Sequence, residues 1–532
     1  MVTSEKLIRI PDLDHQEQAA LDELVVQWRA KRSRNNIRSA FYDMKNSERS
    51  LMAEAVPSVV RRRRFVLGWS AIAVDKLNRR CNLENFYAAD GTDLDALGLP
   101  EIMRQNRLRS ELSQAGLSSL IHAVSFLVTT QGDVDSGEPE VLINTKDAST
   151  ATGMWDVRRR AIRSFLSITA LDDQGEPVGM TMYLPNLNVT MTKAAGKWTV
   201  EHRPHVYGVP VDPLRYKPRT AREFGSSRIT RAVMSLHMQA LAAMIRADVN
   251  GEAYSLPRYV LLGATEEAFR NADGSPKPAW QAAWDAVWAI GDDPDAASDQ
   301  LARADVKQFS GQSPEPQNAH LRMLAQMFSG ETGIPVGELG IIGDANPTSA
   351  EALTVGKDDL ISEAEQTTDG WEPDVSSAVT RALRMMNRGA VPADLDVRAQ
   401  WRNPMFLSRA AAADAGSKII TSQPWLGETT VGLELLGLTD DQITRAQSER
   451  RRNGGSAALR AVAEAAAAGR PVVTDDSASV RAKADAMGVL IRSGASPESA
   501  AAMVGLSGLE FTGAVPVSLR IPSADAAQLE DQ

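Results

Sequence analysis

Four carboxylates close together in the sequence are the first residues that could do chemistry. Asp358, Asp359, Glu363 and Glu365 fall within a stretch with a helical pattern, and carboxylate oxygens are ligands that Mg²⁺ prefers. Such a set could hold a metal ion in a nuclease. Acidic residues clustered on one long helix are more often a solvated acidic face. A carboxylate-metal nuclease is therefore kept as an alternative, and we expect no metal site.

The other reactive residue types form no recognisable catalytic motif. His202 and His205 are close in sequence, but two exposed histidines on a strand explain them more simply than a zinc site does. The sequence contains no Walker-type glycine loop, Cys-x-x-Cys pair, nucleophile elbow or His-Glu-x-x-His motif. The single cysteine, Cys81, rules out an internal disulfide and is expected to be a small buried residue. We expect no catalytic residues, no enzymatic activity and no cofactor.

A glycine-broken segment precedes the carboxylates. It runs from 337 to 348, with three glycines that allow its backbone to change shape, and it contains Asp344 and Asn346 but no arginine or lysine. Between Glu338 and Glu365 there are seven carboxylates and one basic residue, Lys357, which gives a local charge of 1 − 7 = −6. A surface of this kind repels phosphate groups.

Three tryptophans recur at intervals of four residues. Trp280, Trp284 and Trp288 would lie on one side of a helix, and ordinary core packing explains such a stripe. A protein interface explains it equally well, because three tryptophans exceed what the core of so small a segment needs. Both interpretations remain open.

Composition limits the class of protein. The 532 residues, 43% of them hydrophobic, can fill the cores of several domains. Acidic residues outnumber basic ones 68 to 58, and the net charge of −10 argues against a protein that wraps DNA with a basic surface. No apolar run approaches the roughly 18 residues of a membrane span, and the N-terminus lacks the pattern of a signal peptide. We expect a soluble protein without membrane association.

The elements that must position these residues change along the chain. An amphipathic helix is predicted over 14–41 and a mixed α+β region follows it. The predicted strands of that region are 161–170, 180–187, 198–201 and 205–211. Two long helices are then predicted, and they bracket a small insert. Beyond the glycine-broken segment we expect a long helical stretch at 349–387, with a possible bend at 370–373, then a short strand and an alanine-rich helical remainder.

This order of elements resembles that of the portal proteins of long-tailed bacteriophages, especially those of phages of actinobacteria. Short motifs agree with the resemblance. Phe224-Gly225-Ser226-Ser227-Arg228-Ile229 is similar to the entry to the portal stem. Thr332-Gly333-Ile334-Pro335 followed by Asn346-Pro347-Thr348-Ser349 is similar to the passage from stem to channel helix, and Trp401-Arg402-Asn403-Pro404 and Ala413-Asp414-Ala415 fit the segments that lead into the crown.

The resemblance implies a mixed α+β fold, mainly α, with the portal architecture of wing, stem, clip and crown, two long stem helices and an α/β clip insert. In chain order, the implied parts are an α+β wing (1–225), a first stem helix (226–250), the clip (251–315), a second stem helix (316–335), the tunnel loop (336–348), a channel helix with a wing strand (349–405), a helical crown (406–520) and a disordered tail (521–532).

The resemblance also implies a function and partners. Twelve copies would form a ring at one capsid vertex, through which double-stranded DNA passes non-specifically during packaging and ejection. The ring would dock the terminase large subunit and then a head-tail adaptor protein, and it would meet the major capsid and scaffolding proteins. Such a protein is assembled in the host cytoplasm and resides in the virion. The alternative is another minor head or adaptor protein of a phage.

Three groups of residues receive roles from the resemblance. The tunnel-loop residues that would face DNA are Gly340, Ile341, Ile342, Gly343, Asp344 and Asn346. The acidic channel helix would present Glu351, Asp358, Asp359 and Glu363, and the clip interface would use Trp280, Trp284 and Trp288. A conduit should bind its cargo weakly, because each tight phosphate contact must be broken as the DNA moves.

Overall fold

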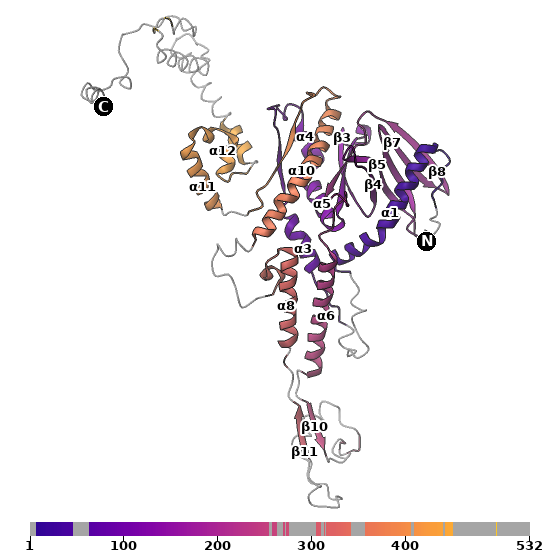
Figure 1. The fold of residues 1–532 in the computed structure, drawn as a ribbon, viewed down its shortest axis with the longest axis vertical. Helices are drawn as coiled ribbons and strands as arrows, with labels where there is room; N and C mark the ends of the chain where they lie inside the picture. Colours follow the sequence, from indigo (N-terminus) through magenta and orange to yellow (C-terminus); the bar gives the residue numbers. More distant parts are fainter. Residues whose placement is uncertain are drawn as a thin grey trace, which may run out of the picture. The chain divides into compact units, whose positions relative to one another are not determined.

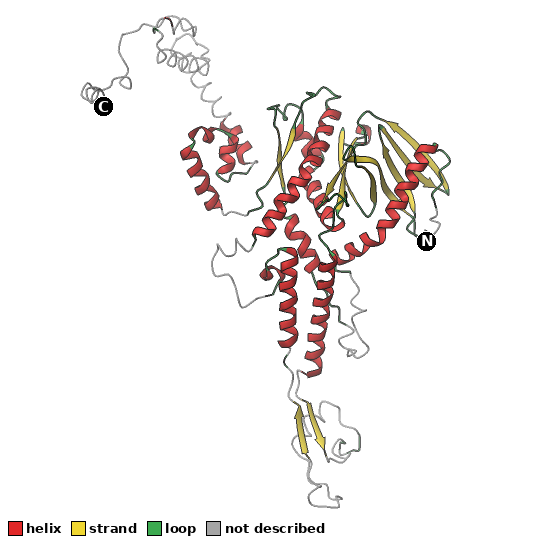
Figure 2. Ribbon diagram, in the orientation of Figure 1, coloured by secondary structure: helices red, strands yellow, loops and turns green. Residues whose placement is uncertain are grey.

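The computed structural model describes residues 7–45, 63–254, 258–262, 305–309, 315–341, 357–405, 409–439 and 442–450, together with 270, 271, 273–275, 313, 496 and 499. Helices and strands both contribute, so the predicted mixed α+β class is confirmed (Figure 2). The chain divides into two units, Met1–Ser408 and Arg409–Gln532.

A five-stranded antiparallel sheet in the first unit is built from consecutive hairpins. Its strands, in spatial order, are β4 (Ala151–Asp156), β5 (Ala161–Leu171), β6 (Pro177–Leu184), β7 (Leu187–Ala194) and β8 (Lys197–Pro204). Helix α1 (His15–Tyr42) lies across this sheet (Figure 1) and begins at a capping box, in which Asp14 and Glu17 satisfy each other's backbone N–H groups. Leu21, Leu24 and Trp28 of α1 are buried against apolar side chains of β5, β6 and β7.

Two smaller sheets share the main core. One has the order β3 (Val141–Asp147), β2 (Val124–Gln131), β9 (Val211–Arg215); the other pairs β1 (Leu83–Ala88) with β12 (Val397–Trp401). Helix α5 (Leu108–His122) packs on both sheets, and α3 (Trp69–Asn78) and α4 (Leu99–Gln105) pack against α5. A short 3₁₀ turn, η2 (Val134–Ser136), lies between β2 and β3.

The strand predicted at 205–211 is wrong for most of its length. Residues 206–209 form bends, and β9 begins only at Val211. Gly208 adopts a φ of +70°, which interrupts an extended strand, and Pro210 has no N–H to donate to a neighbouring strand.

Two long helices leave the main core side by side. They are α6 (Arg231–Tyr254) and α8 (Glu315–Thr332) (Figure 1). Val233 and Ala240 of α6 and Phe328 of α8 are buried where the helices join the core. Helix α6 starts later than the predicted residue 226. Between the two helices in the chain, β10 (Arg258–Leu262) pairs with β11 (Asp305–Phe309).

Helix α10 (Asp358–Met386) runs through the centre of the first unit's core. It continues without a break through Pro373, which lies in the segment where the sequence indicates a bend. Its buried residues include Trp371 and Val375. Two ion pairs join it to β9: Arg381 with Asp212, and Asp374 with Arg215 at 3.5 Å. Residues 349–356, the predicted start of this helix, lie outside the described residues.

The second unit is helical in the part that the structure describes. It contains α11 (Arg409–Ser422), the 3₁₀ turn η5 (Pro424–Glu428), α12 (Thr430–Leu435) and a helix over 442–450. Helices α11 and α12 meet closely at Gly416, where a Cβ atom would lie 2.2 Å from the backbone oxygen of Leu435. Across the described residues of both units, none of the helices has the length and apolar character needed to span a membrane.

Candidate functional site

The candidate site is the place where α8 ends, α10 begins and the predicted tunnel loop is attached. After Thr332, Gly333 reverses the chain with a φ of +66°, and a 3₁₀ turn, η4 (Val336–Leu339), leads to Gly340, whose φ is +80°. Ile341 follows and is half-buried against the main core. The first residues of the predicted loop are therefore packed on the core.

A carboxylate in η4 joins the two sides of the segment 342–356. Glu338 Oε1 lies 3.2 Å from Lys357 Nζ, and Glu338 Oε2 lies 2.9 Å from Lys76 Nζ of α3. Burial raises the pKa of the Glu338 carboxyl, but hydrogen bonds from the two lysines outweigh it and the pKa lies below its ordinary value. Glu338 is thus ionised at neutral pH, and it ties the residues before the segment to the first residue after it.

Arg228, in the motif that precedes α6, connects four parts of the fold. Its Nη2 donates to the backbone oxygen of Thr332 at 2.8 Å and its Nη1 donates to the Tyr216 hydroxyl at 3.1 Å. The guanidinium also donates to the backbone oxygen of Ala73 and forms an ion pair with Glu363. The side chain of Arg228 is only 4% exposed. One cation therefore holds α3, the chain before α6, the end of α8 and the first turns of α10 together.

Glu363 departs from the prediction of an acidic channel-facing residue. Its side chain is 14% exposed and forms ion pairs with Arg228 and Lys217, and it accepts a hydrogen bond from the Tyr216 hydroxyl. Burial raises the pKa of the Glu363 carboxyl, but the charge of Arg228 and these hydrogen bonds bring it below the ordinary value. Its charge is neutralised inside the chain. We call Arg228, Glu363, Tyr216 and Lys217 the Arg228 cluster.

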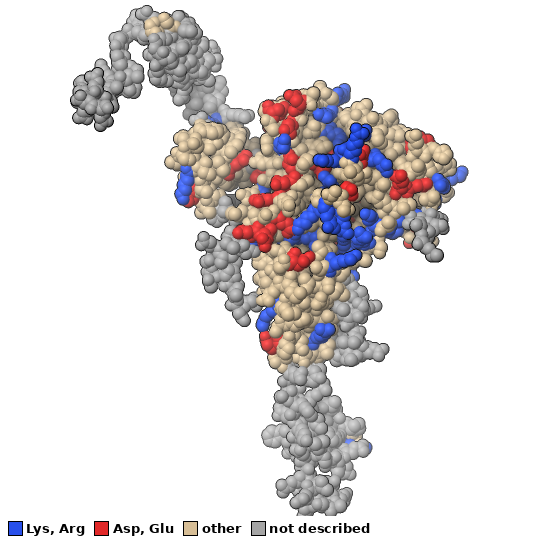
Figure 3. All heavy atoms as spheres, viewed as in Figure 1, with Lys and Arg blue, Asp and Glu red and all other residues tan. Residues whose placement is uncertain are grey.

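Asp358 and Asp359 lie at the exposed start of α10. They share the solvent side of the helix with Glu365 and Asp369, and acidic residues gather over α10 on the face drawn in Figure 3. Carboxylates in a first turn are favoured by the helix dipole. Among the described residues, no three His, Cys, Asp or Glu side chains come together in a way that could hold a metal ion.

The remaining predicted site residues lie outside the described part of the chain. They are Ile342, Gly343, Asp344 and Asn346 of the loop, Glu351 before α10, and Trp280, Trp284 and Trp288 of the insert. Their predicted roles stay predictions.

Two nucleophile candidates among the described residues, Ser70 and Cys81, are shielded from solvent. Ser70 Oγ lies 2.9 Å from His237 Nδ1, but both residues have zero exposure, and burial lowers the pKa of His237 to about 4. Cys81 is buried as predicted, and burial raises the pKa of its thiol to about 12, so almost no reactive thiolate exists at neutral pH. These groups cannot meet a substrate.

His202 and His205 do not form a pair. His202 Nε2 lies 3.1 Å from Glu17 of α1, whereas His205 Nε2 lies 3.0 Å from Asn188 of β7. Each imidazole has its own partner, and the two side chains serve separate contacts.

Sequence patterns missed the Arg228 cluster. The available signal was an arginine between Ser227 and Ile229 in a motif that precedes a long helix. No pattern connects it with Glu363, which lies 135 residues further along the chain.

Comparison with known proteins gives a consistent result. The family described as "Phage portal protein, SPP1 Gp6-like" matches residues 27–455. The portal protein of Mycobacterium phage D29 is 26% identical over 419 residues, which are 75% of this chain and 81% of that protein. The portal protein of Mycobacterium phage L5 is 25% identical over 396 residues, 72% of this chain and 77% of that protein.

Among solved structures, a chain of the virion of a native gene transfer agent particle has a TM-score of 0.36 and 16% identity, covering 70% of this chain and 89% of that one. A chain from the neck of the native particle has a TM-score of 0.35 and 15% identity, covering 70% and 91%. The family match spans most of the sequence, from within α1 to beyond α12. The chain belongs to the SPP1 Gp6-like family of phage portal proteins.

Proposed function

We propose that twelve copies of this chain form a ring at one capsid vertex, with an axial channel for DNA packaging and ejection. The observation that carries the proposal is the family match over residues 27–455, which includes both long helices, the segment between α8 and α10, and α10 itself.

The proposed parts follow the chain. Residues 1–225 form the wing, α6 and α8 the stem, and 251–315 the clip, which contains the β10–β11 pair. The tunnel loop is 336–348, 349–405 provides the channel helix and a wing strand, 406–520 form the crown, and 521–532 form the tail.

The charge of the proposed channel surface is smaller than the sequence count implied. Of the seven carboxylates between Glu338 and Glu365, Glu338 and Glu363 are paired inside the chain, which leaves 7 − 2 = 5. Asp358, Asp359 and Glu365 are exposed. Five carboxylates per subunit, repeated around a ring, still repel the phosphates of passing DNA.

The proposed partners follow from the channel. The terminase large subunit supplies ATP hydrolysis and docks on the ring first, and a head-tail adaptor protein replaces it. Trp280, Trp284 and Trp288 of the clip would contact neighbouring subunits or that adaptor. The wing and crown would meet the major capsid and scaffolding proteins, and assembly would take place in the host cytoplasm.

Electron microscopy tests the ring. The purified full chain, alone and with its scaffolding protein, should give rings with a central hole, in which the subunits can be counted. A monodisperse monomer under both conditions would contradict the proposal. Magnesium-dependent cleavage of plasmid DNA that disappears in Asp358→Asn and Asp359→Asn would favour the nuclease instead.

A charge reversal tests the tunnel loop. Asp344→Lys should slow or stall packaging while rings still assemble, because it adds one cation per subunit to a surface that must let DNA slide. Asp173→Lys is the matched control, since Asp173 is exposed in the turn between β5 and β6. Normal packaging by the Asp344 variant would show that this loop does not line the channel.

A further inference from the structure

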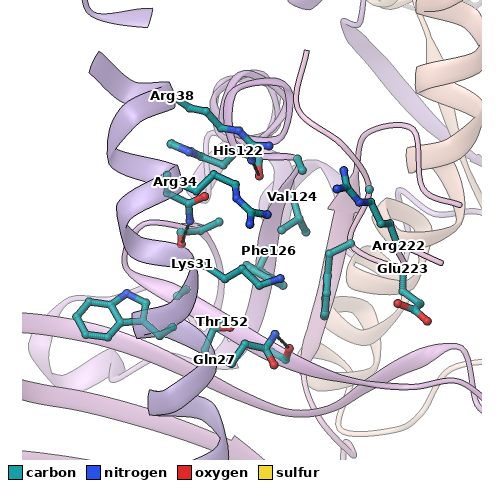
Figure 4. Close-up of a pocket in the computed structure, with 18 of the residues that line it drawn as sticks. Gln27, Lys31, Arg34, Arg38, His122, Val124, Phe126, Thr152, Arg222 and Glu223 are labelled. Carbon is teal, nitrogen blue, oxygen red and sulfur yellow. Dashed lines mark hydrogen bonds between the residues drawn. The ribbon is translucent and has the colours of Figure 1, made fainter. Parts of the chain in front are cut away.

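A cationic pocket lies in the first unit, between α1 and the residues that precede α6. Its volume is about 200 Å³, and β2, β4 and the end of α5 complete its walls. Four lining side chains are cations: Lys31, Arg34 and Arg38 from one side of α1, and Arg222 from the opposite wall (Figure 4). The concentration is notable in a chain whose net charge is −10.

No carboxylate of the described residues forms an ion pair with any of these four cations. Glu223 also lines the pocket, but it extends from the wall opposite α1 (Figure 4). Arg38 Nη1 donates to the backbone oxygen of His122 at 3.0 Å, which fixes the guanidinium at the pocket wall. Four positive charges therefore line one small volume, and Glu223 is the only carboxylate among its lining residues.

The cations repel one another. Burial lowers the pKa of Arg38 to about 10, and Arg34 and Arg222 add to that shift. Burial and the same arginines also lower the pKa of Lys31. Like charges held together disfavour their own charged forms, and an anion between them would reverse that effect.

A buried ring nitrogen at the pocket wall also has no partner. His122 is 6% exposed and lines the pocket, and its Nδ1 makes no hydrogen bond. Buried polar atoms usually have a hydrogen-bond partner. This nitrogen is closed off from the open space of the pocket, so an anion there would be bound by the four cations and not by His122.

We propose that the cationic pocket binds one phosphate-type anion, either inorganic phosphate or a phosphate monoester. A phosphate group carries a charge of about −1.5 to −2 at pH 7 and three strong acceptor oxygens, and guanidinium groups match it in geometry. A carboxylate brings at most one negative charge to four cations. A volume of about 200 Å³ has room for a single phosphate group but not for a DNA duplex. None of its lining residues belongs to the proposed tunnel loop or channel helix.

Calorimetry and thermal unfolding of the full chain test the proposal. Inorganic phosphate, titrated at constant ionic strength against chloride, should bind and raise the Tm, and sulfate should compete with it while acetate should not. In Arg34→Gln and Arg222→Gln, phosphate affinity should fall by at least about tenfold, as expected for loss of a charge-assisted hydrogen bond. Arg158→Gln, which removes an exposed arginine in the turn after β4, should bind phosphate like the wild type.

The unliganded variants separate binding from a purely structural role. Without phosphate, Arg34→Gln should have a Tm equal to or above that of the wild type, because repulsion between cations is reduced. A Tm that falls equally with and without phosphate would overturn the proposal. So would a phosphate response unchanged by both substitutions, or binding of a short single-stranded oligonucleotide without any binding of free phosphate.

Discussion

Replacement of Arg228 by methionine tests the Arg228 cluster. The substitution keeps most of the side-chain length but removes the charge and every donor. Glu363, 14% exposed, keeps Lys217 as a counter-ion, but that lysine is 54% exposed and screened by water. Breaking a buried ion pair on one side costs about 3–5 kcal/mol. Because Lys217 remains as a counter-ion, we expect the free energy of unfolding to fall by about 3 kcal/mol, the lower end of that range. This is a large share of the roughly 5–15 kcal/mol by which a typical domain is stable.

Urea unfolding followed by tryptophan fluorescence measures this loss, because Trp69 and Trp371 are buried in the same core. Arg228→Lys keeps the charge but loses donors, so it should cost less, about 1–2 kcal/mol. The double variant Arg228→Met with Glu363→Gln should cost about 1–3 kcal/mol less than the sum of the single changes, because the two residues are in contact. Arg398→Met is the matched control. Its ion pair with Asp396 is half exposed, and its loss should change stability by less than about 0.5 kcal/mol.

The pH dependence gives a second check. The folded-state pKa of Glu363 is lowered, so its contribution is present above the unfolded pKa and is lost as the pH falls through the folded value. In the methionine variant the carboxylate has lost its main stabilising charge, and protonation relieves the penalty. The destabilisation should therefore be smaller at pH 4 than at pH 7. A loss below about 1 kcal/mol at pH 7, or strict additivity in the double variant, would refute the reasoning.

Three further outcomes are expected. Glu338→Gln removes the ion pairs with Lys76 and Lys357 and should lower the Tm mainly above pH 5. The lowered pKa of Glu338 gives stability that is lost as the pH falls. A decrease in Tm that persists at pH 3 would contradict the role of charge. Burial raises the pKa of Asp374 to about 7; the charge of Asp212 adds to the shift and Arg215 opposes it. As the pH rises from about 4 to about 7, wild-type stability should therefore fall by up to about 1.4 kcal/mol per pH unit. Asp374→Asn should flatten that decline in Tm, and an unchanged profile would assign it to other groups. Gly225→Ala should destabilise the protein by more than about 2 kcal/mol, because a Cβ there would lie 2.2 Å from a backbone oxygen and φ is +76°. Gly91 has a φ of +80° but open space around it, so Gly91→Ala should cost only about 1 kcal/mol. Urea unfolding measures both losses.

Local patterns predicted the long helices well. Helix α1 was expected at 14–41 and lies at His15–Tyr42, because its apolar residues repeat at helical spacing after a capping residue. The start of α6 was misplaced because Ser227 and Arg228 use their side chains for tertiary contacts: the Ser227 hydroxyl donates to the backbone oxygen of Ile121, and Arg228 binds four other segments. The Ser227 hydroxyl also accepts a hydrogen bond from the Ile229 N–H at 3.0 Å, and such local side-chain bonds compete with helix formation.

Contacts between residues far apart in the sequence limit how much of the fold and of the site the sequence can predict. Strand β12 pairs with β1, with Phe86 opposite Ala399. No local pattern in either segment predicts this pairing. The acidic neighbours Asp358, Asp359 and Glu365 predict a surface position for Glu363. Its burial depends instead on an arginine supplied by another part of the chain. Charge counted along a sequence cannot show which charges are neutralised by residues far away.

Strand β8 forms one edge of the five-stranded sheet. Lys197, Glu201 and Arg203 are exposed along it, and the strand ends at Pro204. Charged side chains and proline at a sheet edge discourage a second strand from adding to it. Copies of this chain crowded beside one another would therefore not extend the sheet from molecule to molecule along β8. At this edge, contacts with a neighbour would be made by side chains and not by added backbone hydrogen bonds, which lowers the risk of β-aggregation there.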